Sequence, residues 1–130
     1  MSDAEKWYLE ALRILRLVLG EGHEAVAGVC GSLGEVYSSQ GRLEEAVKMH
    51  KLALGAYRGA SERDSEKVAI ALCTLGTTLY RRRLYDRAMK RLEEAYEMSR
   101  RLYGDDHEQV AAVLNNMAQV LGDQGRVAES

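Results

Sequence analysis

Apolar residues recur along this chain at steps of three and four, which is the spacing of one face of an α-helix. In the first clear segment these residues are Val26, Val29, Cys30, Leu33, Val36 and Tyr37. Gly41 follows, and glycine readily adopts the left-handed conformation that ends a helix. A second run with the same spacing extends from Leu43 to Tyr57 and stops near Gly59. The pattern therefore predicts two helices joined by a short turn.

This pair of helices returns along the chain with a fixed period. A large apolar residue followed by a small one recurs every 42 residues, as Leu33-Gly34, Leu75-Gly76 and Met117-Ala118. Residues 4–19 match a second helix, and residues 110–121 match a first helix. With A for first helices and B for second helices, the predicted order is B, A-B, A-B, A. We expect a partial repeat at 1–25, repeats at 26–67 and 68–109, and a partial repeat at 110–130, together forming one piece of a longer array.

The small residues in the first helices predict how these helices pack. Glycine inside a helix costs about 1 kcal/mol relative to alanine, yet Gly34 and Gly76 occupy the same phase of the period. A repeated cost of this kind indicates that another helix approaches closely there. Short connections make neighbouring helices antiparallel, and a period in this range is typical of solenoids. The predicted fold is therefore an all-α solenoid of antiparallel helix pairs.

The overall composition excludes several classes of protein. The chain is 46% hydrophobic and 29% charged, with a net charge of −2, which is ordinary for a globular domain and argues against a chain that coats nucleic acid. No apolar run is long enough to span a membrane, and Met1-Ser2-Asp3-Ala4 opens no signal segment. Cys30 and Cys73 lie among apolar neighbours, so we expect buried, reduced thiols and a cytoplasmic protein.

The charges are distributed unevenly along the chain. Residues 68–103 carry a net charge of +4, whereas residues 1–67 carry −2 and residues 104–130 carry −4. The basic residues of this central repeat are Arg81, Arg82, Arg83, Arg87, Lys90, Arg91, Arg100 and Arg101. One interpretation is a solvated face whose arginines pair with neighbouring acids. Another is a docking patch for an acidic peptide, and a nucleic-acid surface is the least supported because few aromatic residues are interleaved.

No catalytic or metal-binding constellation is expected, and no cofactor. His23 and His107 fall in equivalent inter-repeat loops and lack a second ligand at helical spacing, so we interpret them as residues that cap the next helix. His50 lies on the inner stripe of a helix, where we expect a half-buried spacer. Gly20-Glu21-Gly22 follows no strand, and it is interpreted as a helix stop. The sequence therefore does not predict an enzyme.

The repeated residues carry a family resemblance. Leu33-Gly34, Tyr37, Gly41, Ala46 and Ala53 stand at the spacing of the tetratricopeptide repeat, over a period longer than its usual length of about 34 residues. The long form, with Gly-Glu-Gly-His at 20–23 and Gly-Asp-Asp-His at 104–107, resembles the repeats of kinesin light chains. One departure is Arg83, which replaces the turn glycine of the second repeat. The resemblance covers essentially the whole chain and implies a module that binds other proteins.

The resemblance also implies where a partner binds. First helices line the concave groove in such arrays, and the positions assigned to it are Ser32, Glu35, Thr74, Thr77, Arg81, Asn115, Asn116 and Gln119. Asn and Gln amides satisfy the backbone of an extended peptide without adding charge. We expect Asn115, Asn116 and Gln119 to hold the peptide main chain, and Arg81 to contact an acidic side chain.

Two functions from different classes follow from these patterns. The first is a protein-protein interaction scaffold that binds an extended peptide, in one interpretation an acidic one, in its groove, as kinesin-light-chain-like cargo adaptors do. The second is a structural or oligomerising spacer with no peptide site of its own. The first predicted helix shows apolar residues outside its inner stripe, at Trp7, Leu9, Ile14 and Leu17. We therefore expect a homo-oligomer formed through exposed terminal helices, with no nucleic acid and no membrane as a partner.

Overall fold

The computed structural model describes residues 2–60 and 64–129, and within these ranges it contains helices and no strand. The helices are α1 (Asp3–Leu19), α2 (Glu24–Ser39), α3 (Leu43–Ala60), α4 (Glu66–Arg81), α5 (Tyr85–Tyr103) and α6 (Glu108–Glu129). This order confirms the predicted all-α arrangement, in which α2, α4 and α6 are first helices and α1, α3 and α5 are second helices. The contacts divide the chain into two compact units, Met1–Arg63 and Asp64–Ser130.

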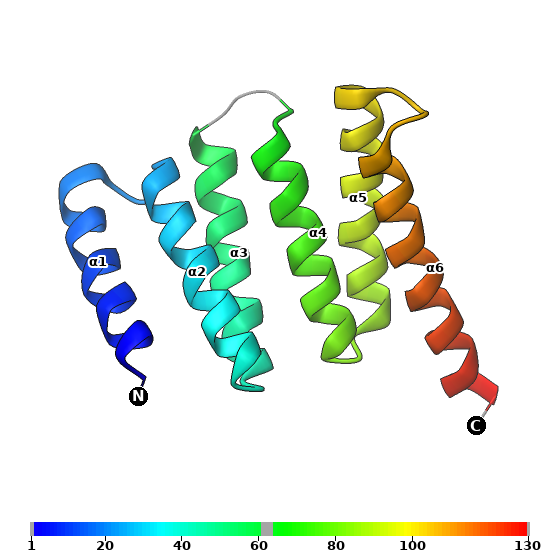
Figure 1. Ribbon diagram of the computed structural model, residues 1–130, viewed down its shortest axis with the longest axis horizontal. Coiled ribbons are helices and arrows are strands. Elements are labelled where there is room, and N and C mark those ends of the chain that lie inside the picture. The colour runs from blue at the N-terminus through cyan, green and yellow to red at the C-terminus, as the bar shows by residue number, and fades with distance from the viewer. Residues whose placement is uncertain (1, 61–63, 130) are drawn as a thin grey trace. The chain divides into compact units, whose positions relative to one another are not determined.

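The first unit contains α1, α2 and α3. Helix α2 packs against both neighbours and runs antiparallel to them (Figure 1). The core of the first unit consists mainly of the apolar stripe of α2, where Leu33 and Cys30 are fully buried. Leu12 from α1 and Ala53 from α3 pack against this stripe. Fully burying a leucine side chain stabilises a fold by about 1.5–3 kcal/mol. The predicted helical stripes therefore form the core that holds this unit together.

The second unit contains α4, α5 and α6. Helix α5 is antiparallel to α4 and α6 and packs against both, and α4 also contacts α6 (Figure 1). Leu72 and Leu75 of α4, Leu92 of α5 and Val113 of α6 are at most 2% exposed. The two first helices of this unit, α4 and α6, therefore both pack against α5 and also contact each other.

The tight turns of the two units have the same geometry with different residues. Gly41 has a φ of 75°, and Arg83, which occupies the equivalent position, has a φ of 63°. In both turns a backbone N–H after the left-handed residue donates to a carbonyl five residues earlier, from Arg42 to Tyr37 and from Leu84 to Leu79, each at 2.9 Å. This is the bonding pattern of a Schellman cap. A side chain in this conformation is strained, because its Cβ crowds the backbone.

The residues that precede the first helices cap them. His23 Nδ1 accepts a hydrogen bond from the Ala25 N–H at 3.0 Å, and His107 Nδ1 accepts one from the Gln109 N–H at 3.1 Å. These bonds confirm the interpretation of both histidines as caps. At the same phase of the period, Ser65 caps α4 by accepting from the Val68 N–H at 3.1 Å.

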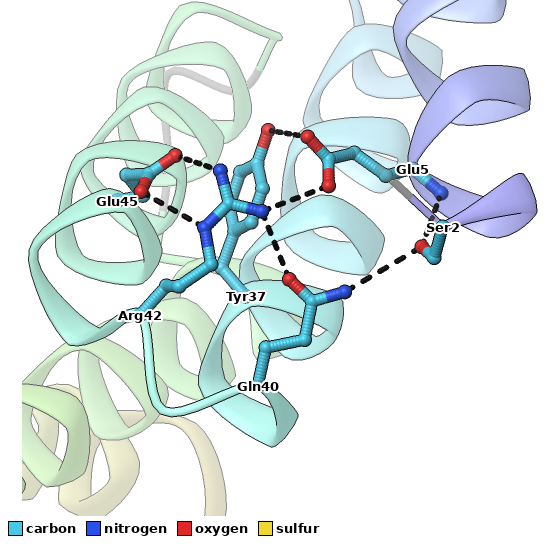
Figure 2. Close-up of polar contacts among 6 residues, drawn as sticks. All are labelled: Ser2, Glu5, Tyr37, Gln40, Arg42 and Glu45. Carbon is cyan, nitrogen blue, oxygen red and sulfur yellow. Dashed lines mark hydrogen bonds and ion pairs between the residues drawn. The ribbon is translucent and has the colours of Figure 1, made fainter.

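A polar network fastens α1 to the turn between α2 and α3, and the period of the sequence does not predict it. Its members are Ser2, Glu5, Tyr37, Gln40, Arg42 and Glu45 (Figure 2). The Glu5 carboxylate, only 4% exposed, accepts from Arg42 Nη1 at 2.8 Å and from the Tyr37 hydroxyl at 3.4 Å. The Arg42 guanidinium also lies 4.5 Å from the centre of the Tyr37 ring. A buried carboxylate is tolerated only when it is paired in this way.

The same network explains the ionisation of its arginine. Hydrogen bonds to Glu45 and to Glu5 raise the pKa of the Arg42 guanidinium above its usual range, so the group stays charged. At the corresponding phases of the period, Glu5 is replaced by Val47 and Met89, and Arg42 by Leu84. One helix junction of this chain therefore uses a charged pair at two phases where the sequence elsewhere carries apolar residues, Met89 at the phase of Glu5 and Leu84 at that of Arg42.

Three expectations about single residues are wrong. Leu9 packs against the core of the first unit, because it faces α2 and not solvent. His50 is 4% exposed, which makes it fully buried, because its ring lies directly on Gly34. Cys73 is only partly buried, because it borders a pocket; Cys30 is fully buried as expected.

Candidate functional site

A pocket of about 190 Å³ lies in the second unit, between the two first helices α4 and α6 and beside the end of α5. Helix α4 contributes Ala69, Ile70, Cys73 and Thr74; α5 contributes Ser99 and Tyr103; and α6 contributes Gln109, Ala112, Val113 and Asn116. The pocket therefore opens where first helices meet, which is the kind of surface that the resemblance assigns to a partner.

Short side chains create this space. Ala69 and Ala112 end at Cβ, and Cys73 is only one atom longer, so the facing sides of α4 and α6 leave room that larger residues would fill. Burial raises the pKa of the Cys73 thiol, and burial with the nearby Glu66 carboxylate raises that of the Tyr103 phenol. Both groups stay neutral near pH 7, and the other lining residues are uncharged types. The pocket is therefore suited to a neutral group.

A few polar groups of the pocket can form hydrogen bonds with a ligand. The Thr74 hydroxyl donates to the Ile70 carbonyl at 2.9 Å, so it meets a ligand as an acceptor. The Asn116 side chain is partly buried and offers both a donor and an acceptor. The Tyr103 ring stacks on His107, with centroids 4.4 Å apart and planes inclined by 17°. One wall is thus held by ring stacking, while Asn116 supplies an amide that can donate and accept hydrogen bonds.

The residues assigned to the groove in the second unit are only partly brought together. Thr74 and Asn116 line the pocket, whereas Asn115 and Gln119 are exposed on α6 outside it. The Thr77 hydroxyl donates to the Thr74 carbonyl at 3.0 Å. Arg81 is the last residue of α4 and is exposed.

In the first unit, Ser32 is partly buried and Glu35 is exposed, both on α2. Glu35 Oε1 lies 3.7 Å from Nε2 of His50, and that nitrogen has no hydrogen-bond partner among the described residues. Burial lowers the pKa of His50, and the Glu35 carboxylate opposes this shift. The imidazole therefore stays neutral near pH 7, and it reaches toward the same α2 surface that carries Glu35.

Part of the basic central repeat is neutralised by its neighbours. Arg100 Nε donates to Asp105 at 2.8 Å, Arg91 Nη1 donates to Glu94 at 3.0 Å, and Arg101 binds Asp64 through two nitrogens at 2.5 and 3.2 Å. These pairs raise the pKa of Arg100 and Arg101. The interpretation as a solvated, paired face is correct for these three arginines, all of which lie on α5.

The sequence missed the residues that close the pocket from the side. Ser99, Tyr103 and Gln109 come from the end of α5 and the start of α6, where the pattern indicated only a helix end and a break. The available signal was Tyr103, an aromatic residue placed directly before the loop glycine Gly104. Its role as a wall depends on the stacking with His107, which the period does not predict.

Within residues 2–60 and 64–129, no three His, Cys, Asp or Glu side chains are grouped so that they could hold a metal ion. None of the helices in the described part of the chain is long and apolar enough to cross a membrane.

Comparisons with known proteins indicate a repeat protein. The family model described as Tetratricopeptide repeat matches residues 1–59, 30–101 and 67–130. Among solved structures, the crystal structure of BtubC (BKLC) from P. vanneervenii superposes with a TM-score of 0.81 and is 28% identical in sequence. The match covers 92% of this chain and 47% of that one, so the chain spans about half the length of that protein. No curated protein matches the sequence.

Proposed function

Because this chain belongs to the tetratricopeptide-repeat family, we propose that it binds an extended peptide along its first helices, with one apolar side chain of the peptide in the α4–α6 pocket. The repeat matches and the likeness to a kinesin-light-chain-like structure support a protein-interaction scaffold. The tetratricopeptide-repeat fold is typically non-catalytic.

The observation that carries the proposal is the neutral pocket of the second unit. A site for an extended peptide needs an apolar recess for an alternate side chain and polar groups for the main chain. Ala69, Ala112 and Val113 supply the apolar recess, and Asn116 supplies an amide at its edge. Asn115 and Gln119 extend the amides along the exposed side of α6, so that they contact the main chain of the same peptide.

Arg81 gives the proposed site its preference for an acid. It stands at the end of α4, four residues beyond Thr77 and seven beyond Thr74, so it lies on the same side of that helix. A peptide with an apolar residue in the pocket and an acidic residue toward the end of α4 would use both features. The partner class is therefore a neutral-to-acidic extended segment of another protein.

A screen of random extended peptides, followed by titration of the best binder, tests this function. Filling the pocket with Ala112→Leu should weaken binding at least about tenfold, equivalent to about 1.4 kcal/mol. Asn116→Ala should weaken it as well, whereas Ala111→Leu, which adds the same side chain one residue away, should not. If both pocket variants bind the peptide with unchanged affinity and unchanged helicity, the assignment of the pocket is wrong.

The spacer alternative gives a different result in the same screen. It predicts no peptide with saturable binding, together with self-association of the chain. Exposed apolar residues on α1 and α6 support the spacer as the second candidate function.

A further inference from the structure

Ser99 gives the α4–α6 pocket a buried hydroxyl without a partner. The residue lines the pocket from α5 and is only 2% exposed. Its hydroxyl forms no hydrogen bond with any residue in the described part of the chain. Buried hydroxyls in proteins are normally paired. An unpaired one beside a cavity therefore marks the place of a hydrogen-bonding atom of a ligand.

Serine at this position is also an exception to the period. The same phase holds Leu15 in α1 and Tyr57 in α3, and both of these large side chains pack against the core of the first unit. In α5 the small Ser99 leaves open the space that a large side chain would take. The exception therefore widens the pocket on its α5 side and supplies the hydroxyl that an occupant meets there.

A second wall of the pocket suits a sulfur atom. Tyr103 lines the pocket, and its ring is stacked on His107. The stacking takes up one face of the ring, so its edge and its other face remain for contacts with an occupant. Thioether sulfur makes favourable contacts with aromatic rings, often at the ring edge.

The lining restricts the chemistry of the occupant. The residues described around the pocket are all uncharged types, so a charged side chain would lose its hydration there without gaining an ion pair. A hydrocarbon side chain such as that of leucine would leave the Ser99 hydroxyl buried and unpaired, which weakens binding. The pocket therefore suits a neutral, apolar side chain that also carries a hydrogen-bond acceptor.

We propose that the peptide side chain in the α4–α6 pocket is that of a methionine, whose sulfur accepts a hydrogen bond from the Ser99 hydroxyl. A thioether is an acceptor within an otherwise apolar side chain. The unbranched chain of methionine adapts to irregular gaps, such as the one left by Ala69 and Ala112. This specificity rests on the proposed function, because it requires that a peptide enters the pocket.

Three peptides that differ at one residue test the proposal. In the peptide selected by the screen, the pocket residue is the one whose replacement by alanine has no further effect in Ala112→Leu. Peptides with methionine, norleucine or leucine at that residue are titrated into the unmodified chain. Norleucine has a CH₂ group in place of the sulfur, so the methionine peptide should bind at least about threefold more tightly than the norleucine peptide. The leucine peptide should also bind more weakly than the methionine peptide.

Ser99→Ala tests whether the hydroxyl causes this preference. The variant should bind the methionine and norleucine peptides equally, with its affinity for the norleucine peptide no lower than that of the unmodified chain. Ser39→Ala is the control, because it makes the same change on an exposed residue of α2, and it should keep the preference. Ser99→Ala should not lower the free energy of unfolding, since the removed hydroxyl has no bond within the described fold. A clear loss of stability would show a structural role for Ser99 and would overturn the proposal.

The remaining outcomes separate this proposal from the proposed function. Equal affinity of the unmodified chain for the methionine and norleucine peptides, or a preference that survives Ser99→Ala, would overturn the assignment of methionine and leave the peptide pocket in place. If no peptide binds, or if Ala112→Leu binds every peptide as the unmodified chain does, the proposed function fails as well.

Discussion

The imidazole of His50 lies so close to Gly34 that a Cβ at residue 34 would sit 2.5 Å from its Cε1 atom. Gly34→Ala should therefore overpack the α2–α3 contact and lower the free energy of unfolding by about 1–3 kcal/mol. Chemical denaturation measures this change.

Gly28 of the same helix is the matched control, because a Cβ there meets nothing within 4 Å. Gly28→Ala should raise the free energy of unfolding by up to about 1 kcal/mol, as alanine is the better helix former. Equal effects of the two substitutions would show that close approach does not explain the glycine at residue 34.

The buried His50 should make stability depend on pH. Burial lowers its pKa below the ordinary value of 6.5, so the unfolded chain takes up a proton before the folded protein does. The free energy of unfolding should therefore fall as the pH drops below about 6.5, until the lower pKa of the folded protein is passed. Denaturation midpoints measured between pH 8 and pH 5 would show this loss.

His50→Leu copies the residue that the second unit carries at this phase, Leu92. It should remove the histidine part of the acid sensitivity and stabilise the protein by about 1–3 kcal/mol at pH 8, since it removes a buried nitrogen that has no hydrogen-bond partner among the described residues. A pH profile identical to that of the unmodified chain would contradict this account of His50.

Replacing the strained turn residue Arg83 with glycine should stabilise the protein. Arg83 has a φ of 63°, so Arg83→Gly should relieve the backbone and stabilise the second unit by about 1 kcal/mol. Gly41→Arg, at the equivalent turn, should destabilise the first unit by a similar amount. Thermal melts of both variants measure the pair; two shifts of the same sign would argue against backbone strain as the cause.

The charged cluster around Glu5 should be replaceable as a whole but not in part. Arg42→Leu alone leaves the buried Glu5 carboxylate without its cation and should lower the melting temperature by several degrees. Adding Glu5→Met gives both positions residues found at the same phases elsewhere, Leu84 and Met89. The double variant should recover most of the lost melting temperature. If its melting temperature instead falls by the sum of the changes in Arg42→Leu and Glu5→Met alone, the two side chains are not coupled.

The fold could be predicted because it depends on recurring positions. The glycine at residues 34 and 76 and the apolar stripes follow the period, and His23 and His107 lie two periods apart. The structure and the family match agree with the fold that these positions predict. Arg83 could also be identified as a departure, and its left-handed backbone shows that the turn dictates the conformation whichever residue occupies it.

The site could be predicted only in part, because it depends on positions that do not recur. The pocket arises where Ala112 replaces Ile70 one period later and where Tyr103 stacks on His107. The Glu5–Arg42 pair joins residues 37 apart, and the period gives no reason for it. Side-chain partners of this kind are set by three-dimensional packing, so the family resemblance assigned Asn116 and Thr74 to a partner-binding surface but did not reveal the recess between them.

The central claim is that a peptide binds in the α4–α6 pocket, and amide chemical-shift mapping of the isotope-labelled chain during titration with the selected peptide tests it most directly. The account predicts saturable shifts at Cys73, Thr74, Ala112 and Asn116, lost in Ala112→Leu and kept in Ala111→Leu. Saturable shifts confined to other helices, with these four amides unmoved, would contradict it.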